Sequence, residues 1–105
     1  MKNDNAVVYI FKQKESGLVK VGYTTDIDTR ISTLERQGGN EIILKYVSIE
    51  MPLKLAKIVE GIVHNMLHIY RRKGEYFACD FDYAVSRLEY ILDSEDFARR
   101  VLQNG

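Results

Sequence analysis

Two short runs of β-branched and aromatic residues, close together near the start of the chain, constrain the fold most. Residues 6–12 read AVVYIFK and residues 18–23 read LVKVGY. These compositions predict β-strands, and the polar residues 13–17 between them are few enough for a hairpin connection. The chain therefore begins with an antiparallel strand pair on which the later elements pack.

A helix is predicted directly after this strand pair. Asp26 is a good N-cap, and the pair Gly38-Gly39 suits a C-terminal stop. Between these limits one apolar stripe recurs at helical spacing, formed by Ile27, Ile31 and Leu34.

The middle of the chain predicts a third strand and a long helix. Residues 41–49, EIILKYVSI, are apolar on both faces of a strand, so we expect this strand to be buried. Pro52 suits the first turn of a helix that runs to about Tyr70. The helix has a wide apolar face, made by Leu55, Ile58, Val59, Ile62, Val63, Met66 and Leu67.

The last third predicts a short extended segment, EYFA, and two helices. Asp80 caps a helix that ends at about Leu92, and Ser94 caps a final helix over about 94–103. The order of elements predicts an α+β fold with a small central sheet of about three strands, largely antiparallel and flanked by helices.

Length and composition predict a single globular domain. The chain has 105 residues, of which 46% are apolar and 29% charged, so we expect one domain over 1–105 with a core at about 6–92. No apolar run approaches the ~20 residues that span a membrane, and MKNDN at the start is too polar for a secretory signal. Cys79 is the only cysteine, which fits a reducing compartment, so we expect a cytoplasmic (intracellular) protein without membrane contact.

Charge gives little support for bulk attraction to nucleic acid. Fifteen basic and fifteen acidic residues cancel, although Arg71, Arg72 and Lys73 form a local basic run. Such a run is compatible with a nucleic-acid surface and is also typical of a solvated face.

Three polar side chains on the long helix are candidates for chemistry. Glu60, His64 and His68 are four residues apart and share one stripe beside the apolar face. They either belong to the polar side of an amphipathic helix or look into a cleft. A Glu-x-x-x-His pair is a weak metal signal, because no third ligand accompanies it at a diagnostic spacing.

The hairpin and the first helix supply further candidates. Tyr9 is either a packing residue or, beside cations that favour its phenolate, a general base. Lys20 and Tyr23 would lie near Tyr9, on opposite faces of the hairpin. Arg30 is either a surface residue or a guanidinium fork that clamps a phosphate.

Together these positions resemble the GIY-YIG nuclease superfamily, and more closely its short phage- and virus-type branch. The resemblance spans roughly residues 7–92. VVY (7–9) stands where the first motif ends in its tyrosine, and KVG (20–22) stands where the second motif reads YIG. Arg30 follows at the expected place on the first helix, and Glu60 matches the single metal-binding glutamate of the family.

The chain also departs from the family pattern. Lys20 replaces the tyrosine of the second motif, and Leu34 stands where many members carry a histidine. GEYF (74–77) looks like the short strand that closes the domain in this branch. Glu75 lies near the position of the late asparagine of the family, which has no obvious counterpart here.

The resemblance implies a metal-dependent endonuclease that hydrolyses phosphodiester bonds in DNA, with RNA as the other candidate substrate. Glu60 would hold one Mg²⁺ or Mn²⁺ ion, Tyr9 would deprotonate the attacking water, and Arg30 would balance charge on the phosphate.

The remaining candidates would assist this chemistry. Tyr23 is the second choice as base, Lys20 would bind the phosphate or lower a tyrosine pKa, and His64 would support the site or carry a proton. Two alternatives stay open: a nucleic-acid-binding module that keeps the fold but does not cleave, and a small protein-interaction domain.

Overall fold

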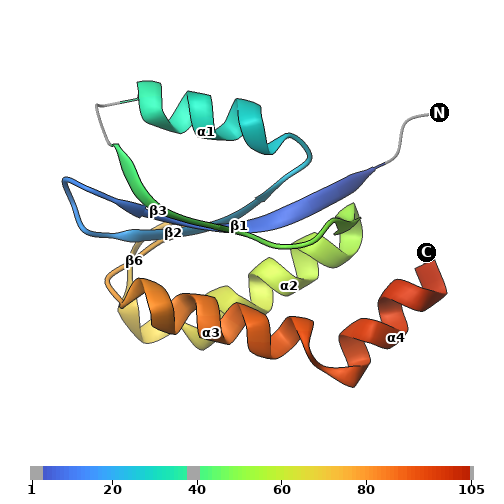
Figure 1. Cartoon of the computed structure of the whole chain (residues 1–105). Coiled ribbons are helices and arrows are strands. Elements are labelled where there is room, and N and C mark those ends of the chain that lie inside the picture. The colour runs from blue at the N-terminus through green and yellow to red at the C-terminus, as the bar shows by residue number, and fades with distance from the viewer. Residues whose placement is uncertain (1–3, 38–40, 105) are drawn as a thin grey trace.

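The computed structural model describes residues 4–37 and 41–104, which form a layered α+β structure. The α+β class is confirmed, but the sheet has six strands where about three were predicted. Figure 1 shows α1 (Ile27–Arg36) on one face of the sheet, and α2 (Leu53–Met66) and α3 (Phe81–Leu92) on the opposite face. None of the helices in the described residues is long and apolar enough to cross a membrane.

The predicted hairpin is confirmed and forms the centre of the sheet. β1 (Asn5–Gln13) pairs antiparallel with β2 (Val19–Thr24), with Tyr9 opposite Gly22. The other edge of β1 pairs with β3 (Ile42–Val47), and the strand order is β3-β1-β2-β6-β5. β1 is thus paired on both edges, and helices cover both faces of the sheet, so its residues are almost continuously buried.

Three very short strands enlarge the sheet. β5 (Arg71–Lys73) and β6 (Tyr76–Phe77) form a small hairpin whose β6 strand pairs with the first residues of β2. β4 (Met51–Pro52) pairs with the start of β1. The predicted extended segment EYFA contains β6, whereas strands of two or three residues are too short to show an alternating pattern.

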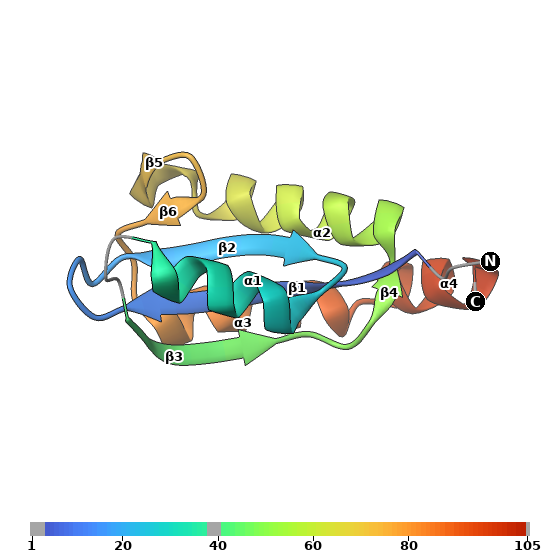
Figure 2. The same cartoon turned by 90° about the horizontal axis from the view of Figure 1, so that it is seen from above.

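The prediction that the third strand is buried is wrong. Only Ile42 of the six β3 residues is buried, while Ile43, Leu44 and Val47 are each more than a third exposed. The reason is the position of β3 at the end of the sheet (Figure 2), where no strand of the described residues pairs with its outer edge.

The helix caps are confirmed in part. The Asp26 carboxylate accepts a hydrogen bond from the Thr29 amide at 3.1 Å, and α1 ends at Arg36, so the predicted stop at Gly38-Gly39 lies outside the described residues. The Ser94 hydroxyl accepts a hydrogen bond from the Phe97 amide at 3.1 Å at the start of α4 (Glu95–Asn104). Asp80 precedes α3 as predicted, but its side chain makes no capping hydrogen bond.

The long helix is shorter than predicted at both ends. Pro52 precedes α2 as its N-cap residue and is not part of the first turn. At the other end α2 stops at Met66, and His68–Tyr70 form a separate 3₁₀ turn. The Leu67 amide bonds to the carbonyls of both Val63 and His64, a tightening that commonly ends an α-helix.

Two hydrophobic clusters lie on the two faces of the sheet. The larger cluster packs the sheet against α2 and α3 and includes Val8, Ile10, Val59 and Leu88. The smaller one lies under α1 and consists of Tyr9, Phe11, Leu34 and Ile42.

Candidate active site

Tyr9 lies on the α1 face of the sheet, with its phenol directly over Gly22. The rings of Tyr9 and Phe11 stack with centroids 4.5 Å apart. A Cβ atom at position 22 would lie 2.6 Å from Tyr9 Cζ and closer still to its hydroxyl oxygen. Glycine is therefore needed at this point of β2 because any side chain would displace the phenol.

The loop after Gly22 places Arg30 above the same face. Thr24 Oγ1 accepts a hydrogen bond from the Asp26 amide at 3.1 Å, and Asp26 in turn caps α1. The Arg30 amide donates to the Asp26 carbonyl at 3.1 Å, so Arg30 sits in the first turn of α1 with an exposed side chain. Burial raises the pKa of the Tyr9 phenol, and the positive charge of Arg30 opposes this rise.

Helix α2 brings Glu60 to this place by docking along β2 (Figure 2). His64 Nε2–H donates to the Val21 carbonyl at 2.8 Å, and His64 Nδ1 accepts from Arg71 Nη2 at 3.4 Å. A carbonyl oxygen can only accept, so the proton is on Nε2. Both ring nitrogens of His64 thus hold α2 and Arg71 in position. Glu60 lies one helical turn before His64 on α2, so this contact also fixes the position of Glu60 beside β2.

The Glu60 carboxylate is buried without full compensation. Its side chain is 12% exposed, and Oε2 has no hydrogen-bond partner among the described residues. His64 Nε2 is 3.9 Å from this oxygen. Burial, and after it the Glu75 carboxylate, raises the pKa of Glu60 to about 7, against the opposing charges of Lys20 and Arg71. Such a group readily takes up a proton or a cation.

Lys20 and Glu75 form an ion pair beside Glu60. Lys20 Nζ lies 2.9 Å from Glu75 Oε1 and 4.7 Å from the centre of the Tyr76 ring. The Glu75 carbonyl also accepts a hydrogen bond from the Val21 amide at 3.0 Å. The turn between β5 and β6 is thereby fixed to β2, and Glu75 becomes a second carboxylate of the site.

The electrostatics of Tyr9 differ from the sequence-based expectation. Tyr9 is 1% exposed, and this burial raises its pKa above the ordinary value. Arg30 opposes the shift, whereas Glu75 and Glu60 add to it. Desolvation therefore outweighs the cation that was expected to favour the phenolate. The charge of Lys20 acts on the two carboxylates.

The structure gathers most of the predicted residues but not all. Tyr9, Lys20, Arg30 and Glu60 share the α1 side of the hairpin and its β2 edge, with His64 adjacent. Tyr23 is paired with Val8 and packs on the opposite face, against the larger hydrophobic cluster. His68 lies in the 3₁₀ turn, where its Nδ1 is 2.9 Å from the Asn65 carbonyl oxygen, and it is exposed.

Sequence reasoning gave no site role to Arg71 or Glu75. Arg71 belongs to a basic run that was interpreted only as a surface feature, and Glu75 was identified only as the residue near the asparagine position. Both reach the site through the β5–β6 hairpin, which pairs with β2 across more than fifty positions of the chain. No local pattern reports such a pairing.

The donor set fits a hard divalent cation with a water-rich shell. The described residues contain no group of three His, Cys, Asp or Glu side chains placed to hold a metal. Mg²⁺ typically keeps several waters and binds one or two carboxylates. Glu60, with its unpartnered buried oxygen, and the neighbouring Glu75 match this requirement.

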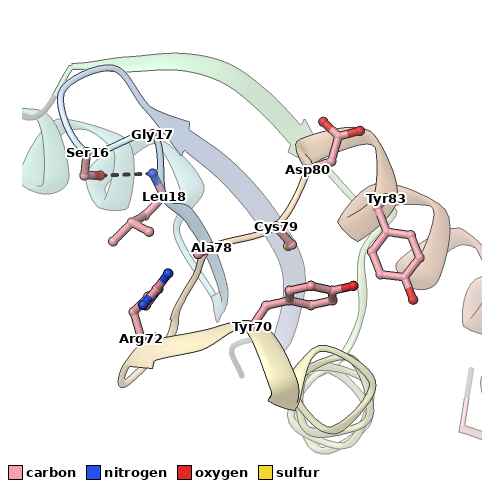
Figure 3. A pocket seen from close by; sticks show the side chains of 9 residues that line it. All are labelled: Ser16, Gly17, Leu18, Tyr70, Arg72, Ala78, Cys79, Asp80 and Tyr83. Atoms are coloured by element: carbon pink, nitrogen blue, oxygen red, sulfur yellow. Dashed lines mark hydrogen bonds between the residues drawn. The ribbon is translucent and has the colours of Figure 1, made fainter.

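A separate hollow of about 530 Å³ lies at the end of the β5–β6 hairpin that is opposite its turn (Figure 3). Arg72, Tyr70 and Tyr83 line it, with Asp80 at its rim in the view shown. The tyrosine rings meet edge to face with centroids 6.1 Å apart. The successive residues Arg71 and Arg72 therefore serve different places, the first the carboxylate site and the second the hollow.

Comparison with known proteins adds a family to this geometry. No curated protein and no solved structure matches the chain. The family model of the T5orf172 domain matches residues 6–94, which run from the second residue of β1 to the end of α3 and beyond. This is a phage-associated domain that is often linked to nuclease-like folds. The chain belongs to the T5orf172 domain family.

Proposed function

We propose that this chain is a metal-dependent endonuclease of the GIY-YIG type that hydrolyses phosphodiester bonds in DNA. One observation carries the proposal: the charges of Arg30 on α1 and of Glu60 on α2 both act on the Tyr9 phenol of β1, and one carboxylate oxygen of Glu60 is buried without a hydrogen-bond partner among the described residues. Packing alone does not require a phenol, a guanidinium and a carboxylate to meet, whereas phosphodiester hydrolysis uses all three.

Arg30 is suited to bind the phosphate. Its side chain is exposed, and it forms no ion pair with the described residues. The planar fork of a guanidinium matches two phosphate oxygens at once. In this role Arg30 neutralises the charge that develops on phosphorus during attack.

Glu60 is suited to hold the divalent ion, with Glu75 beside it. Bound Mg²⁺ or Mn²⁺ would supply positive charge to the leaving oxygen of the phosphodiester. Glu60 must be ionised for this, and Lys20 and Arg71 favour the ionised form. Lys20 thus favours the ionised form of Glu60 and holds the Glu75 carboxylate in place through their ion pair.

Tyr9 is proposed to accept the proton of the attacking water. In the described structure it is a neutral phenol, because burial and the two carboxylates hold its pKa above the ordinary value. Arg30 is the cation that favours its deprotonation. His64 acts as a positioning residue, since its ring nitrogens are bonded to the Val21 carbonyl and to Arg71.

The burial of Tyr9 also favours a second candidate function, a nucleic-acid-binding module without cleavage. A phenol that is 1% exposed has little access to an attacking water. Lys20, which stands at the tyrosine position of the second motif, is engaged with Glu75. Such a module would bind nucleic acid in a salt-sensitive way through Arg30 and Arg71.

A plasmid assay separates these functions. Supercoiled DNA is incubated with Mg²⁺ or Mn²⁺ and the wild type, Glu60→Ala, or the matched control Glu50→Ala, whose side chain is exposed. The nuclease proposal predicts nicking by the wild type and by Glu50→Ala, and none by Glu60→Ala or with a chelator. Salt-sensitive binding without nicking would identify the binding module, and neither activity would favour a protein-interaction domain.

A further inference from the structure

The hollow beside the β5–β6 hairpin has no part in the chemistry proposed above. Its volume of about 530 Å³ falls within the range of ~300–1,000 Å³ that ligand pockets commonly have. Its lining combines the aromatic rings of Tyr70 and Tyr83 with the guanidinium of Arg72. In Figure 3 the Tyr70 ring lies between Arg72 and Tyr83. Ring faces beside a positive charge are the groups that bind a nucleotide through its base and its phosphate.

The two tyrosine rings are exposed although they are large and aromatic. The exposed fraction is 36% for Tyr70 and 41% for Tyr83, and the rings contact each other edge to face. Neither residue is part of the two hydrophobic clusters that hold the helices on the sheet. Packing of the core therefore does not account for this pair, and ring surface remains available to a ligand.

The aromatic lining continues along α3. Arg87 Cζ lies 5.4 Å from the centre of the Tyr83 ring and 5.6 Å from the centre of the Tyr90 ring. Residues 83, 87 and 90 share one stripe of the helix because of their spacing, and Tyr90 is 64% exposed. Aromatic and cationic side chains thus form one row that leads out of the hollow.

Two opposite charges of the hollow are available to a ligand. Arg72 is exposed, and neither Arg72 nor Asp80 forms an ion pair within residues 4–37 and 41–104. The Asp80 side chain also makes no capping hydrogen bond to α3. A carboxylate repels a free anion but accepts hydrogen bonds from the amino groups of a base. The charges therefore suit a nucleotide better than inorganic phosphate.

We propose that this hollow binds an unpaired nucleotide of a DNA single strand. The base stacks on Tyr70 and Tyr83, and Arg72 binds a phosphate of the same strand. The inference rests on the proposed function, because the strand is taken to be part of the DNA that is cleaved. Bases in a duplex are covered by their neighbours on both faces, so stacking on protein rings requires an unpaired base.

The hollow and the carboxylate site are connected through β5. Arg71 and Arg72 are consecutive residues of this strand, so their side chains leave it on opposite faces. Arg71 reaches His64 at the carboxylate site, at 3.4 Å, while Arg72 lines the hollow. Consecutive Cα atoms are only ~3.8 Å apart, so one DNA strand that crosses β5 can contact both guanidiniums. The substrate class inferred is DNA with a single-stranded segment next to the cleaved bond.

Fluorescence anisotropy with a labelled dT strand of about 12 nucleotides tests the stacking, in EDTA so that binding is measured without cleavage. Tyr70→Ala and Tyr83→Ala should each weaken binding about tenfold. Tyr83→Phe keeps the ring and should bind like the wild type. Ile69→Ala is the matched control, because Ile69 is exposed next to Tyr70 but does not line the hollow.

The salt dependence of the same binding tests the phosphate contact. Arg72→Ala should weaken binding and lower the slope of log affinity against log salt by about one, because one phosphate contact is lost. Lys54→Ala removes a charge from the exposed face at the other end of α2 and should leave affinity and slope unchanged. An unchanged slope in Arg72→Ala would overturn the phosphate contact.

A second strand of equal length with abasic positions separates stacking from charge. The wild type should bind this strand about tenfold more weakly than the dT strand, whereas Tyr83→Ala should bind both alike. Annealing the dT strand to its complement should likewise remove the difference between the wild type and Tyr83→Ala. Equal binding of the two single strands by the wild type, or undiminished binding by both alanine variants of the tyrosines, would overturn the proposal.

The outcomes for the hollow and for the nuclease are distinguishable. Plasmid nicking that depends on Glu60, by a protein whose strand binding ignores the tyrosines, would leave the proposed function intact and reject the hollow as a nucleotide site. Binding that depends on Tyr70 and Tyr83, by a protein that does not nick, would support the hollow and reject the nuclease.

Discussion

The two faces of the sheet are built differently. The face toward α2 and α3 buries sixteen residues in one cluster, all of them apolar. The face toward α1 buries four, one of which is the phenol-bearing Tyr9. The α1 face also adjoins a cationic side chain and two carboxylates, Lys20, Glu60 and Glu75.

The difference separates stability from chemistry. Burial of apolar area stabilises the fold, whereas burial of an unpartnered carboxylate or an ionisable phenol opposes folding. The α2/α3 face supplies the first contribution. On the α1 side, burial raises the pKa of two groups, Tyr9 and Glu60. Raised pKa values gathered beside an exposed Arg30 are typical of a functional site.

The largest expected effect is a loss of cleavage when Arg30, on α1, is replaced. Arg30→Ala should lower the rate on the order of 10²- to 10³-fold, because the phosphate loses its guanidinium. The melting temperature should change little, since the side chain is exposed. Arg30→Lys should recover little activity, because an ammonium lacks the fork. Arg36→Ala, on the same helix, is the matched control and should cleave normally; unfolding of Arg30→Ala would instead assign Arg30 a structural role.

Truncation of one leucine on each face tests where stability resides. Leu88 is fully buried in the larger cluster, and Leu34 lies in the smaller one. Leu88→Ala should lower the free energy of unfolding by about 3 kcal/mol, and Leu34→Ala by clearly less. Urea unfolding measures both. Equal losses would contradict the division between the faces.

Gly22→Ala should lower both stability and cleavage activity. The added methyl group meets the Tyr9 ring, so we expect a loss of about 2 kcal/mol in the free energy of unfolding and reduced cleavage. Gly61→Ala is the control, because a Cβ atom there meets nothing within 4 Å. In the middle of α2 it should stabilise the protein by up to about 1 kcal/mol. A neutral Gly22→Ala would show that the phenol is mobile.

The smallest expected effect concerns Glu60 and pH, measured without metal. The pKa of Glu60 is raised from 4.5 to about 7 on folding, so the folded state binds its proton more tightly than the unfolded state. Protonation of Glu60 therefore stabilises the folded wild type at low pH, and this stabilisation is lost as the pH rises from 4.5 through about 7. Glu60→Gln does not titrate and should be about 1 to 2 kcal/mol more stable than the wild type at about pH 8. Below 4.5 this advantage should disappear, whereas Glu50→Gln should show no such dependence.

Local chemistry made much of the fold predictable. The hairpin and the caps at Asp26 and Ser94 follow from strand composition and side-chain hydrogen bonding within a few residues. The exposure of β3 did not follow, because composition does not show which strand lies at the end of a sheet. The segment that contains β6 was predicted as extended, but β5 and its pairing with β6 were missed, because a strand of three residues is too short to carry a pattern.

The sequence predicted the residues of the candidate site better than it predicted their electrostatic environment. Tyr9, Arg30 and Glu60 were identified through a family resemblance, and in the structure the charges of Arg30 and Glu60 both act on Tyr9. The raised pKa of Tyr9 depends on how deeply the phenol is buried over Gly22. Glu75 joins through a long-range strand pairing. A short sequence motif encodes neither the depth at which a side chain is buried nor the pairing of strands that are far apart in the chain.

Paramagnetic broadening of NMR signals by Mn²⁺ tests the central claim most directly, because it reports cation binding without requiring cleavage. Amide signals of Glu60, Glu75 and the adjoining segment of β2 should broaden first as Mn²⁺ is added, and this broadening should be lost in Glu60→Gln. Strongest broadening in α3 or α4, where acidic residues are exposed, or a pattern unchanged by Glu60→Gln, would contradict the assignment of Glu60 as the cation ligand.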